Sequence, residues 1–123
     1  MKFFSVLASS LVPLAIIALL ISCSTQYKSI QVSLPDMNGK TDGVYRGFYD
    51  LSGTPIKVTV DVTVRNKNIA EVKIVDHRCS PFGKKAEKIT GRIIESQSLD
   101  VDAVSGATGS SKAILKAVEN ALQ

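Results

Sequence analysis

Hydroxyl groups and glycines gather in one ten-residue stretch near the C-terminus, residues 102–111, with the sequence DAVSGATGSS. The residues concerned are Ser105, Gly106, Thr108, Gly109, Ser110 and Ser111. Glycine has no side chain, so a large group can approach the backbone closely at these positions. Where such a turn leads into a helix, the first N–H groups of the helix are unpaired and carry a partial positive charge. The stretch therefore predicts a phosphate-binding turn.

A C-terminal helix is predicted directly after this turn, because apolar residues recur at helical spacing over residues 112–122. The stripe that we expect to be buried contains Ile114, Leu115, Val118, Ala121 and Leu122. We expect the helix to begin near Ser110, with Thr108 or Ser110 as its N-cap residue. Its N-terminus would then point at the hydroxyl-rich turn.

A second amphipathic helix is predicted over residues 84–97 from the same kind of spacing. Its first turns contain Lys84, Lys85 and Lys88, at the end of a helix where positive charge is unfavourable. Two interpretations stay open: one or more of these lysines face a phosphate, or all three form a solvated surface.

Strands are predicted over residues 44–50, 56–64 and 69–75, because apolar and polar residues alternate there. The second is the clearest, with valine at every other position from Val58 to Val64, and a short turn joins it to the third as a β-hairpin. The predicted fold class is α+β, a small antiparallel sheet with this hairpin and two helices packed on one face.

Composition excludes several classes of function. The 123 residues are enough for one domain, and the formal net charge of +4 is too small and too dispersed to predict binding to nucleic acid. The two cysteines do not form a Cys-X-X-Cys pair, so neither a metal site nor a dithiol redox centre is predicted.

The N-terminus predicts export and membrane attachment. Residues 1–22 have a short positive start at Lys2 and an apolar stretch interrupted by Pro13, as in a signal peptide. The sequence LISC that ends at Cys23 resembles the lipobox of bacterial lipoproteins, in which the cysteine becomes a lipid-modified N-terminus. We therefore expect a lipidated N-terminus and tether over residues 23–41, and a domain over residues 42–123 on the extracytoplasmic side. The alternative is an uncleaved signal anchor with an incidental cysteine.

Residues 102–108, DAVSGAT, match the flavinylation motif Asp-X-X-Ser/Thr-Gly-Ala-Thr/Ser, and the chain resembles the FMN-binding domain family on this basis. The domain is similar to those of the C subunit of the sodium-pumping NADH:quinone reductase, the G subunit of the Rnf complex and flavin-bearing surface lipoproteins. Flanking matches cover residues 42–47, 58–64, 93–102 and 117–122. The resemblance extends from about Asp42 to the C-terminus.

The resemblance implies covalent FMN, joined through its phosphate to Thr108 as a phosphoester. A separate magnesium-dependent flavin transferase that uses FAD would make this bond, with Asp102 acting in presentation to, or catalysis within, the transferase. Gly106 and Ala107 would keep the approach to Thr108 open. The remaining cofactor-binding residues that the resemblance implies are Ser105 in the motif and Gly109, Ser110 and Ser111, whose backbone N–H groups would hold the phosphate.

The implied function is that of a membrane-anchored electron-transfer protein without catalytic residues of its own. Its partners would be redox proteins or a quinone-linked membrane complex. Two alternatives stay open: an FMN-binding module that delivers electrons to a partner reductase, and a non-redox surface lipoprotein with a vestigial motif.

Four further side chains have two interpretations each. Tyr45 and Tyr49 either lie beside a flavin ring or pack in the core, and His77 either contacts the flavin or is hydrogen-bonded within its loop. Cys79 has no partner if Cys23 carries lipid, and is then either an inert buried thiol or a reactive one.

Overall fold

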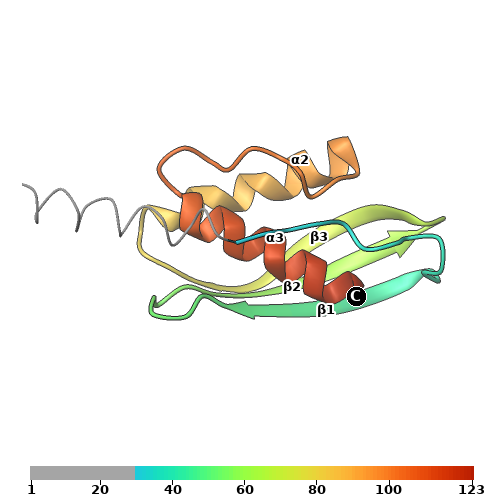
Figure 1. Cartoon of the computed structure of the whole chain (residues 1–123), viewed down its shortest axis with the longest axis horizontal. Helices are drawn as coiled ribbons and strands as arrows, with labels where there is room; N and C mark the ends of the chain where they lie inside the picture. The colour runs from blue at the N-terminus through green and yellow to red at the C-terminus, as the bar shows by residue number, and fades with distance from the viewer. Residues whose placement is uncertain (1–29) are drawn as a thin grey trace, which may run out of the picture. The chain divides into compact units, whose positions relative to one another are not determined.

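The structure, a computed structural model, describes residues 30–123. The predicted signal peptide, residues 1–22, and the predicted lipidation site Cys23 lie outside the described residues. Along residues 32–123 the elements follow in the order β1, β2, β3, η1, α2 and α3 (Figure 1). Within the described part, no helix combines the length and the apolar character that crossing a bilayer would require.

Three antiparallel strands form the sheet in the order β1-β2-β3. They are β1 (Gly43–Asp50), β2 (Lys57–Arg65) and β3 (Asn68–Arg78). The predicted hairpin is confirmed, because β2 and β3 pair along their whole length up to the closing pair of Arg65 and Asn68. The two residues of its turn, Asn66 and Lys67, have φ angles of 53° and 63°. Positive φ at both positions gives a turn whose twist matches that of the strands.

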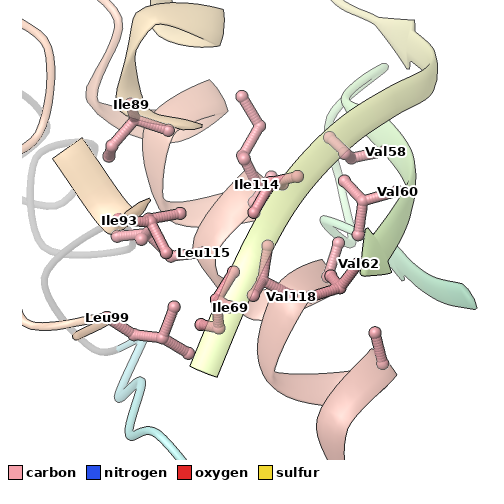
Figure 2. Packing of buried hydrophobic residues seen from close by; sticks show 14 of the residues in the cluster. Val58, Val60, Val62, Ile69, Ile89, Ile93, Leu99, Ile114, Leu115 and Val118 are labelled. Atoms are coloured by element: carbon pink, nitrogen blue, oxygen red, sulfur yellow. The ribbon is translucent and has the colours of Figure 1, made fainter. Parts of the chain in front are cut away.

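The central strand β2 carries the apolar face of the sheet. Its four alternating valines are fully buried, as the period of two predicts. Figure 2 shows Val58, Val60 and Val62 facing the side chains of Ile114 and Val118 on α3. The α+β class is thereby confirmed, with the helices packed on one face of the antiparallel sheet (Figure 1).

The predicted helix over residues 84–97 is divided into two parts. A 3₁₀ helix, η1 (Gly83–Lys88), leads directly into α2 (Ile89–Ser96). Gln97 ends α2 in the left-handed conformation, with φ of 50°. Its side-chain amide pairs with both backbone groups of Ile69 at the start of β3, accepting from the N–H and donating to the carbonyl at 2.8 Å each. This amide therefore ties the helical layer to the sheet.

The last helix, α3 (Thr108–Leu122), begins earlier than expected. Its N-cap is Ala107, which has no side chain that could cap the helix, so the prediction of Thr108 or Ser110 as the N-cap was wrong. The reason is tertiary: the hydroxyl of Ser111 accepts a hydrogen bond from the N–H of Val104, which folds the preceding turn onto the helix. Thr108 is thus the first helical residue.

Part of the segment predicted as a tether lies on the domain. Val32, Leu34 and Met37 pack against the core, and the N–H of Ser33 donates to a carboxylate oxygen of Glu119 at 3.4 Å. Apolar side chains at these positions gain more from burial than from contact with water, which is why the segment does not remain free.

Candidate functional site

The segment that precedes α3 forms a tight, fixed turn. The N–H of Ala107 donates to the carbonyl of Val104 at 3.0 Å, and Gly106 between them has φ of 77°. The N–H of Ser111 then donates to the carbonyl of Ala107 at 2.9 Å, which starts the helical ladder. We call residues 102–108 the motif segment. Its backbone is held at both ends, so the side chain of Thr108 is presented from a rigid support.

The hydroxyl-rich stretch is divided between surface and interior. Ser105 and Thr108 are exposed, whereas Ser110 and Ser111 are buried. Ser111 is 0% exposed and its hydroxyl is used by the Val104 N–H, so its side chain has a structural role. Its own N–H donates to the Ala107 carbonyl and is therefore not free to hold a phosphate as predicted. Thr108 is the exposed hydroxyl at the first position of a fifteen-residue helix, where the unpaired N–H groups lie.

Lys85 of η1 lies directly against the motif segment. A Cβ atom built on Gly106 would lie 2.6 Å from Nζ and 3.2 Å from Cε of Lys85. The ammonium group therefore occupies the space that any side chain at this position would fill. Lys85 thus approaches the motif segment as well as solvent, and the interpretation that it faces a phosphate stays a prediction.

Asp102 lies at the rim of a pocket between α2 and the segment that follows it. Nη1 of Arg92 donates to the backbone carbonyl of Asp102 at 2.7 Å, which fixes the start of the motif segment to α2. The pocket has a volume of about 620 Å³, and its lining includes Arg92, Asp102 and Ser105. The carboxylate of Asp102 is exposed there. The role of Asp102 toward a flavin transferase and the role of Ser105 in cofactor binding stay predictions.

The loop after β3 packs against the first turn of α3. Gly83 lies close to this first turn. A Cβ atom built on Gly83 would lie 2.6 Å from the Ser110 hydroxyl and 2.8 Å from Cβ of Cys79. Burial raises the pKa of the Cys79 thiol, and the negative charge of Glu87 acts in the same direction. The positive charge of Lys84 and a hydrogen bond with Ser110 lower this pKa, but by less. These conditions describe an unreactive thiol.

His77 is hydrogen-bonded, but it lies in β3 and its partner Glu87 lies in η1, so the prediction that His77 is a loop residue was wrong. Its side chain is 1% exposed, and Nδ1 lies 3.2 Å from a carboxylate oxygen of Glu87. Nε2 is buried and has no hydrogen-bond partner among the described residues.

Tyr45 and Tyr49 pack against the core, which supports their structural interpretation. Phe82, in the loop before η1, is an aromatic side chain that is 75% exposed, and no pattern in the sequence distinguished it.

Comparison with known proteins adds two findings. A family model described as an FMN-binding domain matches residues 52–123, which include β2, β3, η1, α2 and α3. An uncharacterized protein of Treponema pallidum (strain Nichols) is 36% identical over 102 residues, which are 81% of this chain. The chain spans 27% of the length of that relative.

Proposed function

Because the chain belongs to the FMN-binding domain family, we propose that it is a membrane-anchored electron-transfer protein that carries FMN as a phosphoester on Thr108. The observation that carries this proposal is the position of Thr108. It is an exposed hydroxyl at the first residue of α3, within a motif segment of small residues. FMN as the cofactor follows from the family, whereas the covalent bond and the anchor belong to the proposal.

The residues around Thr108 suit a phosphate in three ways. Gly106 and Ala107 place no bulky side chain before the hydroxyl. The backbone N–H groups of Gly109 and Ser110 lie in the first turn of α3, where helical partners are missing. Lys85 adds a positive charge beside Gly106. A phosphoester at this position would therefore meet N–H donors and a cation.

Bound FMN supplies one- or two-electron transfer, and the protein sets how readily this occurs through contacts and nearby charge. The chain's own contribution is to hold the phosphate and to present it from a rigid helix end. The exposed Phe82 follows β3 and directly precedes Gly83, which contacts the first turn of α3. We propose that its aromatic ring offers an apolar surface to the flavin.

The anchor rests on the sequence at Cys23, whose preceding residues resemble a lipobox. We propose that the mature protein begins at this cysteine and that its acyl chains hold the domain on the extracytoplasmic side of a membrane. A covalent cofactor suits this location, because a dissociated flavin would be lost to the surroundings. The partners would be a flavin transferase for maturation, and redox proteins or a quinone-linked membrane complex for electron transfer.

One experiment tests both modifications. The full-length protein is produced with a flavin transferase in a bacterium that processes lipoproteins, then unfolded and studied by intact mass measurement and peptide mapping. We expect an acylated N-terminal peptide at Cys23 and one riboflavin phosphate on the peptide that contains Thr108. Thr108→Ala should remove the flavin, while the control Ser80→Ala, an exposed hydroxyl outside the motif, should retain it.

Loss of all colour when the wild type unfolds would refute the covalent bond. A flavin found on a residue other than Thr108 would refute the assignment of the site, and an unmodified Cys23 would refute the anchor.

A further inference from the structure

We propose that Lys85 is the positioning residue for the phosphoryl group that Thr108 receives. In this role its ammonium group stabilises the negative charge that the phosphoryl oxygens carry during the transfer and in the product. The inference rests on the proposed function, because it needs the phosphoester on Thr108. It adds a residue outside the motif, from η1, to the site.

The first argument is the contact between Lys85 and Gly106. The ammonium nitrogen lies 2.6 Å from the position that a Cβ atom of Gly106 would take. Gly106 also has φ of 77°, a conformation that residues with side chains rarely adopt. The turn itself therefore favours glycine here, and the flexible end of Lys85 lies in the space that the absent side chain leaves open.

The second argument is distance along the chain. Thr108 follows Gly106 by two residues, so their Cα atoms are at most about 7 Å apart. A lysine side chain is a flexible four-carbon stem with a compact charge at its end. Because this stem is flexible, the ammonium group of Lys85 can turn from Gly106 towards a phosphate attached to Thr108.

The third argument is charge. Among the ion pairs of residues 30–123, Lys85 forms none, and the same is true of Lys84 and Lys88, whereas Arg46, Lys57 and Lys116 each pair with a carboxylate. Lys85 also comes before the N-terminus of α2, where its charge gains nothing from the helix dipole. It lies instead beside the motif segment that leads into the N-terminus of α3. The positive charge of the Lys85 ammonium group and the partial positive charge at the N-terminus of α3 therefore lie at the same turn, and both would stabilise an anion bound there.

The chemistry of the transfer explains why a cation is useful. The Thr108 oxygen forms a bond to the flavin-side phosphorus of FAD, the bond from that phosphorus to the oxygen of AMP breaks, and the hydroxyl proton is released. FAD carries two negative charges. The phosphodiester on Thr108 keeps one, AMP leaves with two, and the proton balances the difference. Lys85 acts on the phosphoryl oxygens, which stay negatively charged throughout, so it stabilises both the transfer and the product.

The test measures flavin attachment to the purified, full mature chain with a flavin transferase, FAD and Mg²⁺. Lys85→Met removes the charge and keeps a side chain of similar length, whereas Lys85→Arg keeps the charge. Lys88→Met is the matched control, since Lys88 is also exposed and lies in the same 3₁₀ helix. We expect Lys85→Met to lower kcat/KM for flavin attachment about tenfold, and Lys85→Arg to restore most of it.

A second measurement does not depend on the transferase. The ³¹P NMR resonance of the attached phosphodiester should shift in Lys85→Met and stay unchanged in Lys88→Met, because the proposal places Lys85, and not Lys88, beside the ester. All of these lysines are exposed, so circular dichroism should show the same folded state for each variant.

The outcomes separate the two proposals. If the wild type takes up no flavin, the proposed function fails and the inference fails with it. If the wild type is modified and Lys85→Met matches it in both rate and ³¹P resonance, the inference alone is overturned. Equal losses in Lys85→Met and Lys88→Met would indicate a general effect of positive charge and would also overturn it.

Discussion

The close packing of β1 against α3 leads to a sharp prediction at Gly47. A Cβ atom at this position would lie 1.9 Å from the carbonyl oxygen of Ala117 and 2.6 Å from the backbone nitrogen of Ala121. Both are backbone atoms of α3, so no side-chain rotation can relieve the overlap. Gly47→Ala should therefore push the helix away from the strand.

The magnitude follows from the overlap. Ordinary contact begins near 3.4 Å, so the helix must move by about 1.5 Å where Ala117 meets β1. A shift of this size opens gaps around the buried side chains of α3, among them Ile114 and Val118. Overpacking of a core costs about 1–3 kcal/mol, and we expect about 3 kcal/mol here because rigid backbone is involved on both sides. A loss of this size is a large part of the total stability of a small domain.

The assay is equilibrium unfolding in urea of the protein without attached flavin, followed by far-UV circular dichroism. Gly43→Ala is the matched control, because Gly43 is in the same strand and a Cβ atom there would meet nothing within 4 Å. That variant should change the free energy of unfolding by less than about 0.5 kcal/mol. If Gly47→Ala unfolds at the same urea concentration as the wild type, the described contact between β1 and α3 is wrong.

Two further predictions concern Gln97 and Cys79. Gln97→Ala removes the hydrogen bonds to Ile69 and one to the carbonyl of Ile94, and should lower the free energy of unfolding by about 2 kcal/mol. Gln97→Gly relieves the positive φ but cannot replace these bonds, so full stability in that variant would contradict the explanation. Burial raises the pKa of the Cys79 thiol, so iodoacetamide should modify it more slowly in the folded protein than in urea, and equal rates would refute this. The folded state keeps this proton to higher pH than the unfolded state. The contribution of Cys79 to the free energy of unfolding is therefore present below the ordinary thiol pKa. It is lost as the pH rises through the folded-state pKa.

The strands were predictable because their signal is local. The alternation of valine from Val58 to Val64 specifies one buried face whatever lies above it, and the structure buries all four side chains. The division of residues 84–97 into η1 and α2 was not predictable, because apolar spacing does not distinguish a 3₁₀ turn from an α-helical one. The predicted start of α3 was also misplaced. The hydroxyl of Ser111 accepts a hydrogen bond from the Val104 N–H, and Ala107 is left as the N-cap, which the local sequence does not indicate.

The sequence by itself determined the family of this protein. Residues 102–108 match the motif of the FMN-binding domain family, and a motif of neighbouring residues can be read without knowledge of the fold. Only the tertiary structure decided which cation lies beside that segment. Lys84, Lys85 and Lys88 are equivalent in the sequence pattern, and the packing of η1 against the turn brings the ammonium group of Lys85 to Gly106. A contact between residues about twenty positions apart depends on how two elements pack, and no local pattern carries that information.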